Sequence, residues 1–545
     1  MGRTHEVFNQ VPPLADFDLF GTDAALREAV SLHGAAWHAE ALAAQGERLG
    51  SAATLRLADL ANRHPPELVT YDRSGRRVDR VEFHPAWPEL MRMLYADGVH
   101  GSAWLDPRPG AHVARAASFF LHGQAEAGSL CPVTMTFASL PVLRREPALF
   151  AQLEARFRSH EYDPQDVPLS RKTSVTIGMG MTEKQGGSDL RGNTTRATSA
   201  GRGASGLHEY SLVGHKWFFS VPTCDAHLVL ARTGEALSCL YVPRWLPDGS
   251  RNTVRLLRLK DKLGNRSNAS AEVEFEDAVG ILVGDEGRGI ATIMEMAAQT
   301  RLDCVLGSAA LMRRALVEAI HHARHRAAFG RLLAEQPLMQ SVLADLALES
   351  EAATALAMRL AASVERSEES LRERAYRRIV TPAAKFWICK RAIAFAAECM
   401  EVWGGNGYVE DGPMARIFRE APVNSIWEGS GNVMCLDVLR AAARERDARD
   451  ALLQDFGEAT AGEPLLHRSL AALSSVLQSP TESEPLARRT ATQLVLLAQA
   501  TLLRRHAPAP VTDAFIASRF DGSGQVAGLS EVPDAAAFLA RAWPE

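Results

Sequence analysis

The sequence predicts an α+β fold that is mostly helical, with a β domain between helical regions. Helical periodicity dominates before about residue 172, β-branched and turn-forming residues follow to about residue 285, and long helical periodicity returns from Gly289. Strands and helices do not alternate, which argues against a parallel Rossmann sheet. We therefore expect an N-terminal helical domain at 1–177, a middle antiparallel β domain at 178–284, a helical bundle at 285–442 and a C-terminal helical module at 443–545.

Composition indicates a globular protein of several domains. The 545 residues are too many for one core, and the fractions of apolar (46%) and charged residues (23%) are those of soluble domains. The first ten residues hold no apolar run, and no stretch approaches the ~20 apolar residues of a membrane span, so we expect a cytoplasmic protein without membrane contact.

Cysteine and histidine spacing gives no metal signature. The seven cysteines are scattered and odd in number, and none forms a Cys-x-x-Cys pair, so we expect reduced, buried thiols. His321 and His325 have a metal-like i,i+4 spacing, but they lie among arginines with no carboxylate beside them. We expect no metal site.

The N-terminal region is predicted to be helical. Asp23 is a candidate cap for a helix that carries Leu26 and Val30, and further helical patterns cover residues 34–49, 52–62, 85–97 and 111–129. The stretch 128–139 interrupts this rhythm. Its hydroxyl residues are compatible with a pocket lining and equally with a turn; they are Thr134, Thr136 and Ser139.

The middle and later regions differ in their periodicity. Strands separated by Gly, Pro and Asp turns are predicted at 174–182, 209–213, 216–220, 227–231, 238–242, 253–257 and 271–275. Long helices are predicted at 291–325, 337–366 and 371–403, the last broken after Thr381 by Pro382 and ended by the glycines of 404–407.

One carboxylate stands out in the stretch 422–432. Glu428 follows Ile426 and Trp427 and precedes a Gly-Ser-Gly turn. Loss of hydration among apolar neighbours raises a carboxyl pKa toward the range of a general base. The alternative is a helix N-terminus, in which Glu428 lies near a capping turn. The stretch alone leaves both interpretations open.

Three further motifs each allow a functional and a structural interpretation. The glycine-rich passage 178–189 offers free amides and the Thr182 and Ser188 hydroxyls to a phosphate or a polar ring edge, or is only a tight loop. The aromatic strand 214–220 stacks on a flat cofactor or packs in a core. The segment Arg326-Ala-Ala-Phe-Gly binds pyrophosphate or matches a helix dipole.

The order of these motifs is more specific than any one of them. Met181-Thr-Glu-Lys-Gln-Gly-Gly-Ser-Asp, Lys216-Trp-Phe-Phe-Ser, Lys262-Leu-Gly-Asn-Arg-Ser, Arg326-Ala-Ala-Phe-Gly, Gly404-Gly-Asn-Gly-Tyr and Trp427-Glu-Gly-Ser follow one another in the chain. Together they closely resemble the acyl-CoA dehydrogenase family over roughly residues 60–440. The resemblance implies that family's fold: helical domain, β domain and helical bundle, here with an added C-terminal module.

The resemblance also implies an FAD cofactor and a set of residues that bind it. Ser220 corresponds to the hydroxyl that hydrogen-bonds flavin N5, and Arg326, Phe329 and the Gly404-Gly405 turn correspond to the contacts of the ADP half, partly from a neighbouring subunit. The family's expected state is therefore a homotetramer. The cofactor-binding positions that it implies are Met181, Thr182, Gly187, Ser188, Phe218, Ser220, Arg326, Phe329, Gln336, Glu401, Gly404, Gly405, Trp427, Gly429, Ser430 and Asn432.

The implied mechanism is α,β-dehydrogenation with Glu428 as the catalytic base and flavin N5 as the hydride acceptor. The sequence departs from the family pattern near these positions. Trp427 replaces a tyrosine and would crowd the substrate channel, Phe218 replaces a tryptophan, and Glu401 stands where a glutamine is usual. Extra charges at Arg416, Arg419 and Glu420 precede Pro422.

A closer resemblance covers nearly the whole chain: the alkylation-response branch of this family. It implies binding of double-stranded DNA, largely without sequence specificity, and protection or repair of alkylated DNA. An alkylated base or a small acyl-CoA is then the expected substrate. The alternative is a metabolic dehydrogenase of a small or branched acyl-CoA.

Residues 441–545 hold ten arginines but thirteen acids, so only a local basic stripe is available to DNA. The usual fate of any one such cluster is a solvated helix face. The candidate DNA contacts are Arg440, Arg488, Arg489, Arg504, Arg505 and Arg519.

Overall fold

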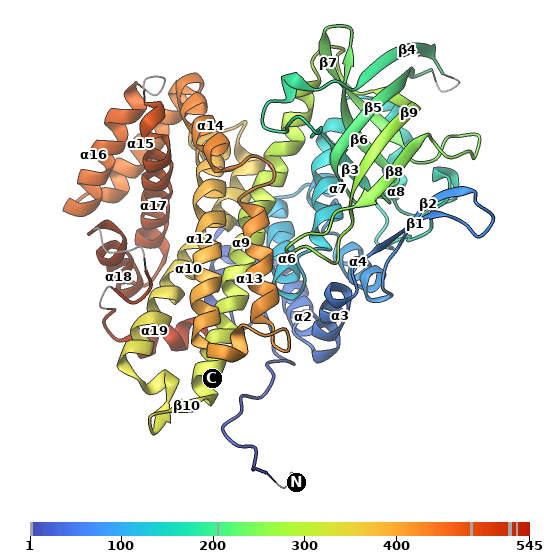
Figure 1. The fold of residues 1–545 in the computed structure, drawn as a ribbon. Helices are drawn as coiled ribbons and strands as arrows, with labels where there is room; N and C mark the ends of the chain where they lie inside the picture. Colours follow the sequence, from blue (N-terminus) through green and yellow to red (C-terminus); the bar gives the residue numbers. More distant parts are fainter. Residues whose placement is uncertain (1–3, 204–205, 480–482, 522–525, 530–531, 545) are drawn as a thin grey trace. The chain divides into compact units, whose positions relative to one another are not determined.

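The computed structural model of this chain describes residues 4–203, 206–479, 483–521, 526–529 and 532–544 (Figure 1). Contacts divide the chain into two units. Unit 1 comprises Met1–Ala52, His112–Ala125 and Cys304–Glu545, and unit 2 comprises Ala53–Ala111 and Glu126–Asp303. Each unit is described by itself.

Unit 2 contains a seven-stranded sheet in the order β3-β6-β4-β5-β9-β7, with β8 paired to β9 and β7 paired back to β6. Its inner face is a continuous apolar core that includes Leu212, Phe219 and Val229. The strands are β3 (Ile177–Gly180), β4 (Arg196–Arg202), β5 (His208–Ser220), β6 (Ala226–Thr233), β7 (Ala236–Pro243), β8 (Val254–Leu259) and β9 (Ser270–Leu282).

The predicted middle β domain is confirmed, with differences in detail. The two strands expected at 209–213 and 216–220 are one continuous strand, β5, and β4 was not anticipated. The sheet is mostly antiparallel, but β3 runs parallel to β6, and one residue pair joins β4 to β6 in parallel. Parallel neighbours need a long connection, and the segment between β3 and β6 is long enough to provide one.

The helices and hairpin of unit 2 correct two expectations. Residues 128–139 do not break the helical rhythm, because Leu130–Leu143 is helix α7. The Thr136 hydroxyl donates to the Pro132 carbonyl at 2.8 Å and accepts from the Ile177 amide at 3.0 Å, so it lies in a helix rather than a turn. Since α7 is buried on nearly all sides, its sequence lacks the periodicity of an amphipathic helix.

The second correction concerns the region expected to be helical throughout. It contains an antiparallel hairpin, β1 (Glu67–Tyr71) and β2 (Arg77–Glu82), and the helix expected to reach 129 ends at Ala125. The remaining helices of this region are α3 (Ala52–Arg63), α4 (Ala86–Ala96), α5 (Ser102–Leu105) and α8 (Pro147–Phe157).

Unit 1 is a helical bundle extended by a C-terminal group of helices (Figure 1). Helix α12 packs against α13, α14 and α17, so the bundle and the C-terminal helices share one core. The elements are α1 (Ala24–Leu32), α2 (Ala39–Leu49), α6 (Ala111–Ala125), α9 (Gly289–His325, which begins in unit 2), α10 (Pro337–Arg366), α11 (Leu371–Ala375), α12 (Thr381–Val402), α13 (Met414–Asn424), α14 (Gly431–Arg444), α15 (Arg446–Thr460), α16 (Pro464–Gln478), α17 (Ala487–His506), α18 (Ala509–Phe520) and α19 (Ala535–Ala542).

Pro382 does not break the helix; a wider, π-helical turn precedes it instead. Residues Tyr376–Val380 form a π-helical turn, and α12 begins at Thr381 with Pro382 in its first turn. Proline lacks an N–H and clashes with the carbonyl four residues earlier, and a wider turn relieves both problems. The expected break after Thr381 is therefore a continuous helix with a local bulge.

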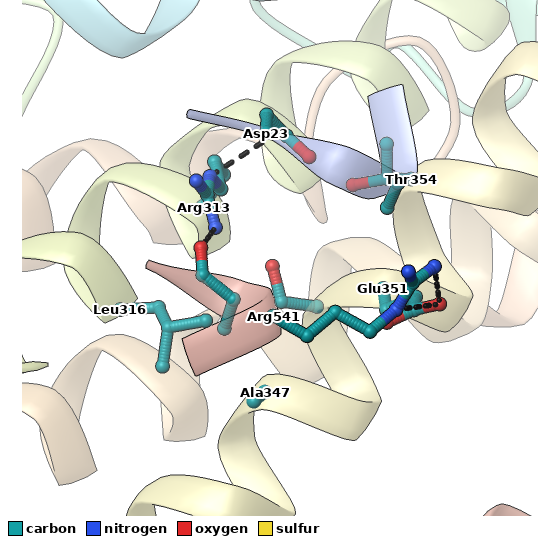
Figure 2. Close-up of a pocket in the computed structure, with 10 residues that line it drawn as sticks. Asp23, Arg313, Leu316, Ala347, Glu351, Thr354 and Arg541 are labelled. Carbon is teal, nitrogen blue, oxygen red and sulfur yellow. Dashed lines mark hydrogen bonds and ion pairs between the residues drawn. The ribbon is translucent and has the colours of Figure 1, made fainter. Parts of the chain in front are cut away.

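The C-terminal helix of unit 1 is anchored by two arginines around a small cavity (Figure 2). Arg313 of α9 is buried, forms an ion pair with Asp23 at 3.2 Å and donates to the Ala542 carbonyl. Arg541 of α19 forms an ion pair with Glu351 of α10 at 2.8 Å. These contacts tie α19 to α1, α9 and α10.

All seven cysteines are free and buried, as predicted. No described helix has both the length and the apolar character that a membrane crossing requires.

Candidate active site

Glu428 lies in the turn between two helices of unit 1. Helix α13 ends at Asn424, and α14 begins at Gly431 with Ser430 as its N-cap. Glu428 adopts a φ of +58° and Gly429 a φ of +108°, so two successive residues have left-handed torsions. A non-glycine residue in that conformation costs roughly 1–2 kcal/mol, and strain of this kind is concentrated at functional sites. The predicted helix start is confirmed, but Glu428 precedes the cap.

The residues around Glu428 fix the shape of this turn. Trp427 and Glu428 are both half-buried, and the Trp427 indole N–H donates to Asn424 Oδ1 at 3.1 Å. A Cβ at Gly429 would lie 2.4 Å from Met434 Cε, a terminal methyl that would have to shift, and the positive φ of Gly429 strains any other residue at this position. The turn therefore presents one carboxylate on a backbone with little freedom.

A hairpin at the end of α9 carries Arg326 and Phe329. Ala327–Ala328 (β10) pairs with Arg331–Leu332 (β11), and Phe329 at the turn has a φ of +54°. Its side chain is 98% exposed, which is unusual for phenylalanine. Gln336 caps α10 and donates to the Ala328 carbonyl at 3.0 Å. The structure thus brings these three predicted residues together.

The N-terminal segment supports this hairpin through Asn9. The Asn9 side chain donates to the Ala327 carbonyl at 2.9 Å and accepts from the Ala327 amide at 2.9 Å, while Arg326 donates to the Asn9 carbonyl. These contacts join residues more than 300 positions apart, so no local pattern could have identified them.

A glycine turn follows α12. Gly404 has a φ of +59°, and a Cβ at Gly404 or Gly405 would meet no atom within 4 Å, so their backbone is open to an approaching ligand. Trp403 fixes the turn, because its indole N–H donates to the Glu318 carbonyl at 3.1 Å and its ring stacks on His322 at 4.7 Å. Glu401 is exposed beside this turn.

The predicted flavin loop of unit 2 is held by a buried ion pair. Lys216 of β5 and Glu183 of the loop are fully buried, with Nζ and Oε1 2.7 Å apart. The Trp217 amide donates to the Thr182 carbonyl at 2.9 Å. A Cβ at Gly187 would lie 2.5 Å from Thr182 Oγ1, so the loop folds tightly on itself. Met181 and Thr182 are thereby fixed at its start, while Ser188 lies exposed near its end.

The charge state of Glu183 follows from its surroundings. Burial raises the pKa of its carboxyl, but the Lys216 ammonium and hydrogen bonds from Thr194 and Thr195 outweigh burial and lower the pKa well below its usual range. A carboxylate paired and hydrogen-bonded in this way is structural. Neither Glu183 nor Lys216 is available for proton transfer.

The end of strand β5 presents Phe218 and Ser220. Phe218 is 54% exposed, and Ser220 is partly buried. The Nε2–H of His227 donates to the Ser220 carbonyl at 3.2 Å, and its ring stacks on Phe219 at 3.8 Å. Burial lowers the His227 pKa to about 3, so its ring is neutral at physiological pH. His227 positions Ser220, a role that its place in a predicted strand did not indicate.

These features fit a flavin, the cofactor that the motifs imply. Phe218 is an exposed aromatic ring beside a hydroxyl residue, and Gly404 and Gly405 leave peptide groups uncovered. Flat rings stack on such aromatics, and phosphates bind open backbone amides and arginines. A flavin supplies hydride acceptance when it is bound.

The candidate DNA-contacting arginines differ in their exposure to solvent. Arg440 of α14 and the two arginines that begin α17, Arg488 and Arg489, are exposed, with Arg488 also donating to Asn432 Oδ1 at 3.1 Å. Arg504 is exposed and donates to the Ala461 carbonyl at 3.3 Å.

Two other candidates are engaged in ion pairs. Arg505 pairs with buried Asp455 at 2.9 Å. The Arg519 side chain is only 7% exposed and pairs with Asp345 at 2.6 Å, so its interaction is internal and it does not suit a DNA contact. Lys385 of the bundle helix α12 is fully buried and does not suit a DNA contact either.

Three family models match this chain. The model described as the adaptive response protein AidB N-terminal domain matches residues 9–164, the acyl-CoA dehydrogenase middle domain matches 178–278, and the acyl-CoA dehydrogenase C-terminal domain matches 287–443. Their order is that of the motifs above.

Relatives extend the similarity to the whole chain. AidB of Escherichia coli strain K12 is 51% identical over 96% of this chain and 96% of its own length. The structure of Caenorhabditis elegans ACDH-11 in complex with C11-CoA has a TM-score of 0.85 at 25% identity and covers 99% of this chain and 93% of that one. The apo form of Bd2924 has a TM-score of 0.84 at 29% identity, covering 92% and 100%. The chain belongs to the acyl-CoA dehydrogenase family of FAD-dependent oxidoreductases, as an AidB-like member.

Proposed function

We propose that this flavoprotein dehydrogenates an acyl-CoA thioester, with Glu428 as the base that removes the α-proton. The observation that carries the proposal is the turn that presents Glu428: a half-buried carboxylate on a left-handed backbone, between Trp427 and Gly429. A general base needs a fixed direction and partial removal from water. Bound FAD accepts the hydride from the β-carbon.

The other residues have binding and orienting roles in this proposal. Met181, Thr182, Gly187 and Ser188 hold the flavin through the loop fixed by the Glu183–Lys216 pair. Phe218 covers the ring, and Ser220 donates to N5. The ADP half is held by Arg326, Phe329, Gln336, Glu401, Gly404 and Gly405, and Trp427, Gly429, Ser430 and Asn432 flank the flavin.

Trp427 favours a small or branched acyl group. Its indole is half-buried directly before the base and is fixed by its hydrogen bond to Asn424. A fixed indole occupies more of an acyl channel than the tyrosine that is usual in the family. The full-length neighbour ACDH-11 was crystallised with C11-CoA, so the two chain lengths to compare are a short branched one and C11.

Anaerobic reduction of the bound flavin tests this proposal. Isobutyryl-CoA and C11-CoA are mixed with the holoprotein, and the flavin absorbance is followed. We expect bleaching by isobutyryl-CoA to be the faster, and Glu428→Gln to abolish bleaching while FAD content is unchanged. Bleaching by Glu428→Gln at the wild-type rate would exclude Glu428 as the base, and a wild-type protein bleached by neither thioester would refute the activity.

We also propose that the protein binds double-stranded DNA without sequence specificity, as expected of an alkylation-response flavoprotein that protects or repairs DNA. The supporting observations are the 51% identity to AidB across the whole chain and the exposed arginines of α14 and α17, two helices that pack together. The helical module alone is not evidence for DNA, because the ACDH-11 structure covers 99% of this chain and was solved with an acyl-CoA.

The salt dependence of duplex binding tests this second proposal. Each phosphate contact contributes about 0.9 to the slope of log affinity against log salt. We expect Arg488→Ala/Arg489→Ala to reduce that slope by up to about 2. A matched control is Arg73→Ala/Arg76→Ala, which removes two exposed arginines from the β1–β2 turn. Equal slopes in all three proteins would exclude the α17 surface.

A further inference from the structure

A buried lysine contacts the turn that carries Glu428. Lys385 lies in the first half of α12, and its side chain is fully buried. Its ammonium donates to the Trp427 carbonyl at 2.7 Å and to the Gly429 carbonyl. These two carbonyls are on either side of Glu428, so one buried donor holds the peptide group before the candidate base and the peptide group that follows Gly429.

The acceptors of this ammonium are backbone carbonyls rather than carboxylates. Among the residues that the structure describes, Lys385 forms no ion pair with an aspartate or glutamate. Its acceptors are carbonyls of the turn between the end of α13 and the start of α14, which lie outside both helices and so have no intrahelical amide partner. A cation there is stabilised without a counter-ion, and its donors are directed at the turn.

The turn requires such a restraint. Glu428 and Gly429 both have left-handed φ values, which a free loop does not maintain at a glutamate. Phe386 and Lys390 of α12 also lie close to Gly431, where a Cβ would be 3.1 Å from Lys390 Cε. One face of α12 therefore supports the whole segment from Trp427 to Gly431.

We propose that Lys385 is a positioning residue for the dehydrogenation, because it fixes the backbone torsions that aim the Glu428 carboxylate. This inference rests on the proposed role of Glu428 as the base. Lys385 touches neither substrate nor flavin in this proposal. Its loss should affect the orientation of the base more than the binding of substrate or cofactor, since those depend on other residues.

The first experiment measures the turn directly, without any substrate. Amide hydrogen exchange is compared between the wild-type holoprotein, Lys385→Met and the control Arg468→Met, which removes an exposed cation from α16 of the same unit. We expect peptides covering 425–432 to exchange about tenfold faster or more in Lys385→Met, because two charge-assisted hydrogen bonds are lost. The Arg468→Met protein should match the wild type. Unchanged exchange in Lys385→Met would overturn the proposal.

The second experiment separates positioning from a merely structural role. We expect Lys385→Met to lower the limiting rate of flavin reduction by the better of isobutyryl-CoA and C11-CoA about tenfold or more, with the half-saturating concentration and FAD content nearly unchanged. A rate that falls only in proportion to lost FAD would show a structural role alone. Lys385→Gln, which retains one donor, should be intermediate and serves if Lys385→Met does not fold.

The two readouts also separate this inference from the proposed function. If neither thioester reduces the wild-type flavin, the proposed activity fails, whereas the exchange experiment still reports whether Lys385 holds the turn. Faster exchange with an unchanged reduction rate would overturn the positioning role while leaving Glu428 as the base.

Discussion

Glu428 differs from the other acidic residues near it more clearly in its backbone conformation than in the residues that surround it in sequence. Its left-handed φ and its position before the Ser430 cap place it outside the helix that follows. The alternative interpretation, in which Glu428 lies in a capping turn, predicts the start of the helix correctly but does not explain the strained torsion of Glu428. The function of the residue stays a proposal, supported by that torsion and by the family.

His227 provides a residue-scale prediction about pH. Its folded pKa of about 3 lies below the usual 6.5, because burial disfavours the charged ring. The unfolded chain therefore binds more protons between these values, and this contribution is complete above pH 6.5 and is lost as pH falls toward 3. One such group contributes a slope of up to about 1.4 kcal/mol per pH unit in the free energy of unfolding.

We expect His227→Leu to reduce the dependence of unfolding free energy on pH between pH 4 and 6, measured by urea titration at each pH. His208→Leu is the control, because that histidine is exposed on the same sheet. A slope in His227→Leu equal to that of the wild type would show that His227 is not kept neutral by the fold.

At the scale of elements, the ends of helices carry the candidate site while the helix interiors carry the packing. The hairpin after α9, the glycine turn after α12 and the turn before α14 each follow or precede a long buried helix. Contacts with distant segments hold them: Asn9 binds the hairpin, the Glu318 carbonyl accepts from Trp403 at the glycine turn, and Lys385 donates to the Glu428 turn. Rigid helices with fixed ends are a common way to orient functional groups.

Helix α19 gives an element-scale prediction. Arg541 pairs with Glu351, which is 14% exposed (Figure 2). It also pairs with Glu28. Removal of the arginine takes away a counter-charge of the largely buried Glu351 carboxylate. Arg541→Ala should therefore destabilise unit 1 by about 2 kcal/mol. Differential scanning calorimetry should show a lower melting temperature, and limited proteolysis should show earlier cleavage near α19. Arg489→Ala, on an exposed position, should behave as the wild type; equal proteolysis of the two variants would contradict this anchoring role.

At the scale of the whole molecule, unit 1 exposes large apolar side chains in the region of the predicted ADP contacts. Phe329 is 98% exposed, Tyr408 82% and Leu338 77%. Exposed aromatic residues of this size are typical of protein interfaces. We propose that a second copy of the chain covers them, as in the expected homotetramer.

Assembly is therefore predicted to depend on Phe329. Phe329→Asp should shift the mass measured by light scattering from a tetramer toward smaller species, because it places a charge in the proposed interface. Leu371→Asp, which changes a residue that is 51% exposed on α11, is the control and should leave the mass unchanged. A wild-type monomer, or a tetramer unaffected by Phe329→Asp, would refute this assembly surface.

Local patterns predicted the elements well where the chain is amphipathic. Asp23 caps α1 through its side chain as expected, and α10 spans the predicted Pro337–Arg366. The predictions were wrong where burial removes periodicity or where pairing is long-range. Helix α7 is apolar on almost every side, and the β1–β2 hairpin depends on packing that a single strand pattern does not reveal.

For the candidate site, the sequence indicated which residues to propose for the chemistry but not what holds them. The residues Glu428, Ser220 and Arg326 were identified from motifs. Their supports were not, since Lys385 acts on carbonyls 42 and 44 positions away and His227 had only the pattern of a strand residue. The burial of Arg519 beside Asp345, 174 positions earlier, was equally invisible in a local basic pattern.

The sequence by itself determined the division into helical and β regions, the family, and the motif residues, because periodicity, capping and motif spacing are local properties of the chain. Only the tertiary structure decided which charges are buried, which backbone turns are strained, and which distant side chains restrain them. Those properties depend on packing between segments far apart in sequence, where desolvation and hydrogen-bond geometry decide whether a lysine is a surface cation or the buried support of a turn.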